Sequence, residues 1–170
     1  MDIVSFCIDL LKVFIYVIPA MVANGTPVVI HGLPPIDMNK KWRDGRRVFG
    51  DGKTWGGFLA GIVGGTIIGG IESAIIWNNI LLPSFVSSLG ALLGDLMASF
   101  IKRRLGLQRG APAPLLDQLD FYVGSLVFLY VFLRISFNIY AILLFALLIY
   151  LLHRATNYTA YKLGLKSVPW

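Results

Sequence analysis

The sequence predicts an all-α integral membrane protein with five transmembrane helices, in one domain that covers residues 1–170. Two features of the composition indicate this class, because 56% of the residues are hydrophobic and only 14% are charged. The third observation is that the apolar residues form long blocks, separated by segments rich in Gly, Pro, Lys and Arg. A helix needs about 20 residues to cross a hydrocarbon core of about 30 Å, and five blocks approach or exceed that length.

The first span is expected at 3–23 and the second at 55–77. Asn24, Gly25 and Pro27 are residues that typically end a helix, so they set the end of the first span. The second span carries glycines four residues apart, a spacing that lets the backbone of a neighbouring helix approach closely. These glycines are Gly57, Gly61, Gly65 and Gly69.

The remaining spans are expected at 85–101, 120–134 and 139–153. Gly90 and Gly94 repeat the small-residue spacing, which predicts that the third span packs on the second. The last two spans are separated by a short segment only, so they should form an antiparallel hairpin.

Most of the basic residues lie in two loops, at 24–54 and 102–119, and in the tail that begins at Arg154. Together these segments hold 13 of the 15 Lys and Arg residues. Because basic loops stay on the cytosolic side of a membrane, we expect the N-terminus outside and the C-terminus in the cytosol. The same rule predicts a multi-pass protein of the cell membrane whose active site opens on the cytosolic face.

The formal net charge of +6 is concentrated at this face, which suits anionic ligands such as phosphates and lipid headgroups. Nucleic acid is not an expected partner, because the basic residues do not form a separate soluble module with interleaved aromatic residues. The single cysteine, Cys7, excludes an intrachain disulfide and a cysteine-based metal site. The glycine pattern leaves the oligomeric state open.

The residues that point to chemistry lie between Asp95 and Asp120. Asp95 is an acid within an apolar helix, and Lys102 and Arg103 follow it at the basic end of that helix. Asp117 and Asp120 are three residues apart, so on a helix they share one face. Carboxylates that hold Mg²⁺ together with substrate phosphates, and cations that neutralise those phosphates, are the groups that a phosphoryl-transfer site needs.

Structural roles compete with this interpretation. The basic run could be the cytosolic anchor of a membrane helix, and Asp117 with Asp120 could cap the helix that begins there. A second basic segment is rich in glycine and contains Arg43, Arg46, Arg47 and Lys53. Backbone amides in such a segment can approach an anion closely. Adhesion to a lipid surface explains the same composition equally well. Asp95 is the hardest of these residues to explain structurally, since an acid among apolar residues needs a partner.

The motifs resemble those of the phosphatidate cytidylyltransferase (CDP-diacylglycerol synthase) family. A Gly-Asp pair at 94–95 precedes a Ser-x-x-Lys-Arg element at 99–103, and two aspartates follow at 117 and 120. The family joins a Ser-x-x-Lys-Arg element to Asp-Arg-x-Asp in the same order. The segment 53–57 likewise resembles the Lys-Thr-Trp-Glu-Gly element of the family.

Several positions depart from the general pattern of the family. Gly56 replaces the usual Glu, Gln118 replaces the usual Arg, and Arg109 with Gly110 stands where a Lys-Asp pair is expected. The His-Gly-Gly element is replaced by 111–114. These departures, the short chain, and the segments 24–27 and 44–55 are more similar to the archaeal branch, the CDP-archaeol synthases.

The resemblance implies transfer of a cytidylyl group from CTP to the phosphate of an isoprenoid ether lipid, 2,3-bis-(geranylgeranyl)-glycerol 1-phosphate, with release of pyrophosphate. It implies Mg²⁺ as cofactor, held by Asp95, Asp117 and Asp120, with Lys102 as a further catalytic residue. The expected phosphate ligands are Arg43, Arg46, Arg47, Lys53, Thr54, Arg103 and Arg109. Candidate nucleotide or lipid contacts are Asn24, Ser99 and Gln108. The alternative is a five-helix transporter or lipid-binding protein whose aspartates form structural ion pairs.

Overall fold

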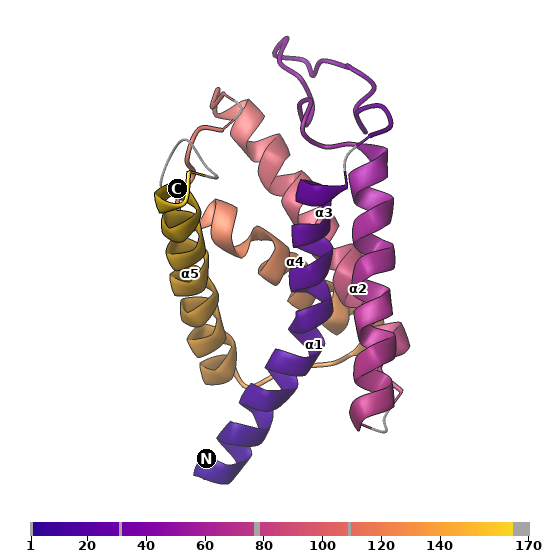
Figure 1. Ribbon diagram of the computed structural model, residues 1–170, viewed down its shortest axis with the longest axis vertical. Coiled ribbons are helices and arrows are strands. Elements are labelled where there is room, and N and C mark those ends of the chain that lie inside the picture. The colour runs from indigo at the N-terminus through magenta and orange to yellow at the C-terminus, as the bar shows by residue number, and fades with distance from the viewer. Residues whose placement is uncertain (1, 31, 77–78, 109, 165–170) are drawn as a thin grey trace.

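The computed structural model describes residues 2–30, 32–76, 79–108 and 110–164, and it contains five long helices (Figure 1). They are α1 (Ile3–Val29), α2 (Trp55–Ile76), α3 (Leu81–Arg104), α4 (Leu116–Leu133) and α5 (Ile139–Lys162). Each is long and apolar enough to cross a membrane. The predicted fold class, an all-α protein with five apolar helices, is confirmed.

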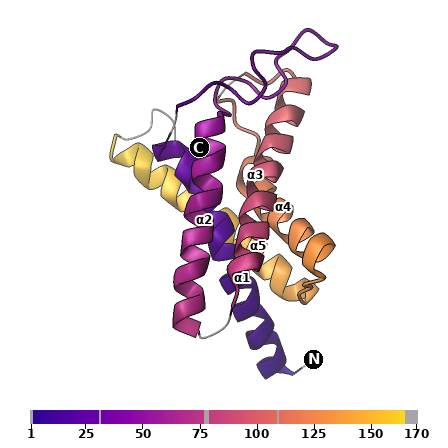
Figure 2. The ribbon, with the colours of Figure 1, turned by 90° about the vertical axis from the view of Figure 1, so that its right-hand side faces the viewer.

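The two basic segments lie at the same end of the bundle. Figure 1 shows the 32–54 segment, the turn after α3 and the C-terminal end of α5 at one end, with the N-terminus at the other. The view turned by 90° places α3 between its neighbours and keeps both segments together (Figure 2). The charges that the sequence groups on one face of the membrane are therefore brought to one end of the fold.

Helix α1 continues to Val29, so the predicted end at 24–27 is wrong. Proline is tolerated inside a membrane helix when a neighbouring helix accommodates the backbone group that it frees, here the Ala23 carbonyl four residues before Pro27. That carbonyl lies against Gly61 of α2. The ring of Pro27 packs on Gly57 of α2, where an added Cβ would lie 3.0 Å from the Pro27 Cβ. Packing against α2 thus carries the helix past its local stop signal.

The other helix bounds differ from the predicted ones at their ends. Helix α3 begins at Leu81 instead of residue 85 and runs to Arg104, while α5 extends beyond 153 to Lys162. Helix α4 begins at Leu116, four residues earlier than predicted, with the Gln118 side chain accepting a hydrogen bond from the Leu115 amide at 2.6 Å. Asp117 and Asp120 of the predicted site therefore both lie inside α4. Trp77, the predicted end of the second span, lies outside the described residues.

The glycine stripe of α2 packs as predicted, but the glycines of α3 do not face α2. Gly61 of α2 lies against the Ala23 carbonyl of α1, where an added Cβ would approach to 2.7 Å. Gly90 and Gly94 of α3 instead pack on α4, against Gly124. The predicted packing of α3 on α2 is confirmed, but it runs through serines of α3 that lie against the glycine stripe of α2, and not through the glycines of α3.

This close approach of α3 and α4 gives a stability prediction. An added Cβ at Gly124 would clash with the Gly90 carbonyl oxygen and lie 2.9 Å from Gly94 Cα, so Gly124→Ala must push the helices apart. We expect a destabilisation of about 1–3 kcal/mol, measured as a lower melting temperature in detergent. Gly25→Ala is the matched control, because no described atom lies within 4 Å of an added Cβ there. Equal melting temperatures for the two variants would contradict the packing.

Buried serines connect the helices that carry the predicted site. The Ser87 hydroxyl of α3 donates to the Tyr16 carbonyl of α1 at 2.7 Å and lies 2.7 Å from the Ser125 hydroxyl of α4. Ser84 and Ser88 of α3 are buried as well. Hydrogen bonds between helices help fix their register within a membrane, so this ladder holds the acids of α3 and α4 at a constant separation.

Candidate active site

Four charged side chains form two ion pairs at the loop end of the bundle. Lys53 Nζ, just before α2, contacts the two carboxylate oxygens of Asp95 in α3 at 2.7 and 2.5 Å. Lys102 Nζ, in the last turn of α3, lies 2.5 Å from Asp117 Oδ1 in α4. All four side chains are between 20% and 28% exposed, so the pairs are only partly shielded from solvent. The structure therefore brings together predicted residues that are up to 64 positions apart, from Lys53 to Asp117.

Asp120 joins this group from the second turn of α4. Its side chain interacts electrostatically with Asp95, Lys53 and Asp117, and its Oδ1 accepts the Phe121 amide at 2.7 Å. The backbone carbonyl of Asp120 lies directly against Gly94, which is why α3 and α4 approach so closely here. Three acids and two lysines thus gather beside the first turns of α4.

The residues that the structure describes contain no group of three or more His, Cys, Asp or Glu that could hold a metal ion. The three predicted metal ligands do not converge, because Asp117 turns to Lys102 and its Oδ2 accepts the Ala113 amide at 2.9 Å. Asp95 and Asp120 remain together. Mg²⁺ commonly uses one or two carboxylates and completes its shell with substrate phosphates and water, so these two acids fit such an ion in the presence of a nucleotide.

Two of the predicted phosphate ligands have structural partners. The Arg46 guanidinium donates to the carbonyls of Arg103 and Arg104 at 3.3 and 2.7 Å. Arg47 donates to Asp37 and to Asp51, with shortest distances of 2.6 Å to each. These arginines hold the 32–54 segment together and fasten it to the end of α3.

Arg103 and Arg104 each have a buried Nε without a hydrogen-bond partner among the described residues. Arg104 is held by hydrogen bonds from its two Nη atoms to Asp44 and to the Arg47 carbonyl, whereas no such bond from Arg103 is found within the described part of the chain. The aliphatic stem of Arg103 lies near Gly50, where an added Cβ would be 3.9 Å from Arg103 Cδ. A half-buried guanidinium without an acceptor is costly to keep, so Arg103 is the strongest candidate for binding a substrate phosphate.

The remaining predicted residues are placed as follows. Thr54 Oγ1 accepts the Gly57 amide at 3.2 Å and so caps the first turn of α2. Arg43 and Gln108 are exposed, Asn24 is partly buried within α1, and Ser99 is buried in α3. Arg109 lies outside the described residues.

Two larger cavities adjoin the charged group, besides a small one of about 20 Å³ that Lys53 and Asp95 line. An apolar groove of about 1120 Å³ runs between α3 and α4, with Val48 and Phe49 at its loop end and Asp120 in its wall. A smaller cavity of about 250 Å³ is lined by Lys102 and Asp117 and by His153, Arg154 and Asn157 of α5. The α5 residues were not predicted as site residues, because a basic residue at the end of a span gives no signal beyond its membrane-anchoring role.

Asp37, another residue that the sequence analysis missed, organises the 32–54 segment. Burial by itself raises the pKa of Asp37, but hydrogen bonds from Arg47 and from the Gly50 and Phe49 amides lower it from 3.8 to about 2. The Asp37 carboxylate is therefore charged near neutral pH.

A pH dependence of the 32–54 segment follows. Because the folded pKa of Asp37 is below 3.8, its contribution to stability is complete above about pH 3.8 and is lost as the pH falls toward 2. We expect amide-exchange protection at 47–51, corrected for intrinsic rates, to be equal at pH 7 and pH 5. Protection should disappear between about pH 4 and 2. A loss of protection already between pH 7 and 5 would contradict this assignment.

Comparisons with known proteins agree on one family. A family model described as "CarS-like: CDP-archaeol synthase" matches residues 6–170. A CDP-archaeol synthase of Sulfolobus acidocaldarius is 50% identical over 163 residues, which cover 96% of this chain and 99% of the relative. One of Aeropyrum pernix is 49% identical over 164 residues, covering 95% and 93% of the two chains.

A solved structure agrees as well. The structure reported as "Structural insight into an intramembrane enzyme for archaeal membrane lipids biosynthesis" has a TM-score of 0.83 and 46% identity to this chain. The match covers 87% of this chain and 94% of the other. With the five apolar helices, it supports a multi-pass membrane protein. The motif resemblance is confirmed, and the chain belongs to the CarS-like family of CDP-archaeol synthases.

Proposed function

We propose that this protein is a CTP-dependent cytidylyltransferase that transfers CMP to the phosphate of 2,3-bis-(geranylgeranyl)-glycerol 1-phosphate, giving CDP-archaeol and pyrophosphate. The observation that supports it best is the meeting of two unlike cavities at the start of α4. The apolar groove suits isoprenoid chains, and the smaller cavity, lined by Lys102 and Arg154, suits a nucleotide. Asp120 lines the groove, and Asp117 with Lys102 lines the smaller cavity. The names of the relatives point to the same lipid class.

In this reaction an oxygen of the lipid phosphate attacks the α-phosphorus of CTP. The bond from the α-phosphorus to the bridging oxygen breaks, and pyrophosphate leaves with the electron pair. A phosphate monoester is already ionised near neutral pH, so the protein need not supply a general base. Its task is to hold two anions in line and to neutralise their repulsion.

Different residues would bind the metal ion and the phosphates. Asp95 and Asp120 would hold Mg²⁺, which when bound offsets the negative charge of the triphosphate. Lys53 pairs with Asp95 and Lys102 pairs with Asp117, and both ammonium groups would move from these carboxylates onto phosphate oxygens when the substrates bind. Arg103 would add a guanidinium fork. The basic loops favour a site on the cytosolic face of the cell membrane, where CTP and Mg²⁺ are available.

The ion pairs predict that Mg²⁺ and CTP bind cooperatively. Without phosphate, Lys53 and Lys102 occupy the carboxylates of Asp95 and Asp117. We therefore expect Mg²⁺ alone, or CTP alone, to change the melting temperature little. Both together should stabilise by more than the sum, with about 2.7 kcal/mol at 100 times the dissociation constant. Saturable stabilisation by Mg²⁺ alone, equal to that with CTP, would contradict the prediction.

The function is tested by pyrophosphate release from purified protein in detergent. Each of the four nucleoside triphosphates is combined with an ether or an ester lipid phosphate, with and without Mg²⁺. Release that requires CTP, the ether lipid phosphate and Mg²⁺ together is the expected result. No release from folded protein would instead favour the transporter or lipid-binding alternative, in which Lys53–Asp95 and Lys102–Asp117 are structural pairs.

A further inference from the structure

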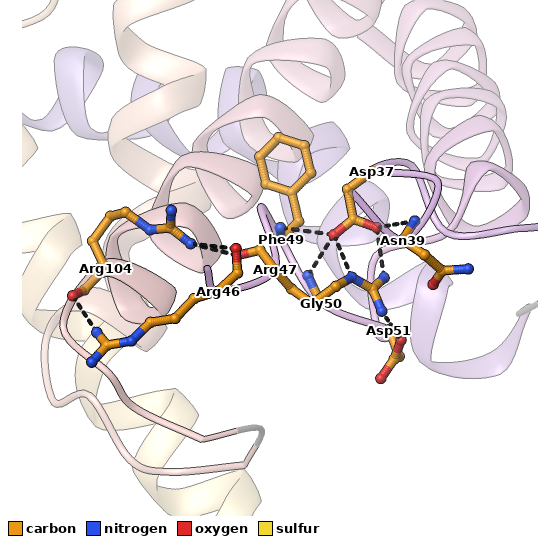
Figure 3. Close-up of polar contacts among 8 residues, drawn as sticks. All are labelled: Asp37, Asn39, Arg46, Arg47, Phe49, Gly50, Asp51 and Arg104. Atoms are coloured by element: carbon orange, nitrogen blue, oxygen red, sulfur yellow. Dashed lines mark hydrogen bonds and ion pairs between the residues drawn. The ribbon is translucent and has the colours of Figure 1, made fainter. Parts of the chain in front are cut away.

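One buried carboxylate holds the 32–54 segment in shape. The Asp37 side chain is fully buried, and it accepts from Arg47 Nε at 3.1 Å and Nη2 at 2.6 Å. It also accepts the backbone amides of Phe49 and Gly50, each at 3.0 Å, and that of Asn39 at 3.2 Å. Figure 3 shows this segment wrapped around the carboxylate. Five donors on one carboxylate make Asp37 the centre of a segment that has no helix of its own.

The same centre fixes the backbone of Lys53. The Ile36 amide, next to Asp37, donates to the Lys53 carbonyl at 2.8 Å. The Lys53 amide donates to the Gly50 carbonyl at 3.3 Å, and Gly50 is itself held by Asp37. Lys53 is thus tied on both sides to groups that Asp37 orders. Its side chain then reaches Asp95 at 2.7 Å.

The ordered segment is also fastened to α3. Arg104 donates to the Arg47 carbonyl at 2.5 Å and to Asp44 at 2.9 Å. Figure 3 shows Arg104 beside Arg46 and Arg47. The Trp42 and Phe100 rings meet edge to face with centroids 5.3 Å apart. These contacts set where Lys53 stands relative to the Asp95 helix.

Phe49 connects Asp37 to the apolar groove. Its amide is bound by Asp37, and its side chain lines the apolar groove together with that of Val48. One carboxylate therefore orders both a cation of the charged group and a wall of the groove. Neither Asp37 nor Arg47 lines either cavity.

We propose that Asp37 and Arg47 form a positioning pair that holds Lys53 against Asp95 and Phe49 against the groove. The pair acts through other residues and does not touch the substrate. An arginine fork on a carboxylate gives a fixed geometry that a single lysine contact does not, which suits a positioning role. The effect on turnover rests on the proposed function, whereas the effect on Lys53 itself does not.

The first experiment measures Lys53 directly, without any enzymatic activity. Asp37→Asn keeps the shape of the side chain and removes the charge, so the segment should loosen. We expect acylation of Lys53 by an amine-reactive reagent, followed by mass spectrometry, to accelerate about tenfold. Lys12, which is 56% exposed at the other end of the bundle, serves as an internal reference whose rate stays constant.

Asp51→Asn is the matched control. Asp51 also contacts Arg47 at 2.6 Å, but its side chain is 66% exposed, and none of the amides that bind Asp37 is bound by it. Its removal should leave Lys53 labelling unchanged. Arg47→Lys is the second test variant, since it keeps the charge and loses the fork, and it should accelerate labelling in the same direction as Asp37→Asn.

The second experiment is a double-mutant cycle on CMP transfer. Asp37→Asn should lower kcat about 30-fold with little change in the KM for CTP. In a Lys53→Met background the same substitution should lower kcat less than about threefold, because its main target is gone. A merely destabilising change would lower kcat by the same factor in both backgrounds.

Two results would overturn the proposal: Lys53 labelling that is the same in Asp37→Asn, Arg47→Lys and the unsubstituted protein, or fully additive losses of kcat in the cycle. The labelling arm also separates this proposal from the proposed function. If the unsubstituted protein transfers no CMP, the proposed function fails, while accelerated labelling would still establish the positioning of Lys53.

Discussion

Asp95→Asn and Asp120→Asn are each expected to lower the turnover of CMP transfer about 10³-fold, while the helical bundle stays folded. Asparagine has nearly the shape of aspartate but carries no charge, so each variant removes half of the pair of acids that would hold Mg²⁺. Asp120 also interacts electrostatically with the charges of Asp95, Lys53 and Asp117. Turnover is measured as pyrophosphate release, and folding as the melting temperature in detergent.

Two further variants sharpen this prediction. Asp9→Asn is the control for loss of an acid, because Asp9 pairs with Lys12 in α1, away from the loop end, and should leave turnover unchanged. Asp117→Asn distinguishes a two-acid from a three-acid site, since Asp117 binds Lys102 and the Ala113 amide. We expect a loss of about tenfold for Asp117→Asn. Near-normal rates for both Asp95→Asn and Asp120→Asn would refute the assignment of the site.

Arg103→Met is expected to lower kcat/KM about 100-fold without lowering the melting temperature. The Arg103 Nε is buried and lacks a partner within the described part of the chain, so its removal costs the folded protein no hydrogen bond through that atom. The loss of activity should come from a weaker charge-assisted contact with a substrate phosphate. Both quantities are measured on the same preparation, by titrating CTP and the lipid phosphate separately.

The neighbouring arginine provides the contrast. Arg104→Met removes hydrogen bonds to Asp44 and to the Arg47 carbonyl, and a ring contact with Phe100 at 4.9 Å. We expect it to release the 32–54 segment from α3, seen as faster amide exchange there. A fall in stability for Arg103→Met that matches Arg104→Met would mean that Arg103 is structural, and the phosphate assignment would fail.

Local sequence was sufficient for the broad plan of the protein. The lengths of the apolar blocks predict five spans, because the membrane sets a minimum length for each helix. The distribution of Lys and Arg predicts that the two loops and the tail share one end, as the described parts of these segments do in Figure 1. The order of acidic and basic residues from Asp95 to Asp120 selects the same end for the site. Each of these properties depends on composition over a segment and not on a particular contact.

Contacts between segments decided the rest. Helix α1 passes its predicted stop because Pro27 packs on Gly57, and Gly94 meets α4 because Asp120 presents a backbone carbonyl there. Nothing in the sequence singles out Lys53 among the lysines as the partner of Asp95. Only the fold brings Lys53 Nζ to 2.7 Å from Asp95 Oδ1.

The same reason explains the arginines and the acids. The sequence does not distinguish a basic loop residue that binds a substrate from one that binds another part of the protein. In the structure Arg47 donates to the Asp37 carboxylate, whereas the Nε of Arg103 has no hydrogen-bond partner among the described residues. The sequence by itself determined the number of spans, the face that carries the charges and the chemical types at the site. The tertiary structure decided which charge meets which, because distances between residues far apart in the chain are set by helix packing and not by their spacing.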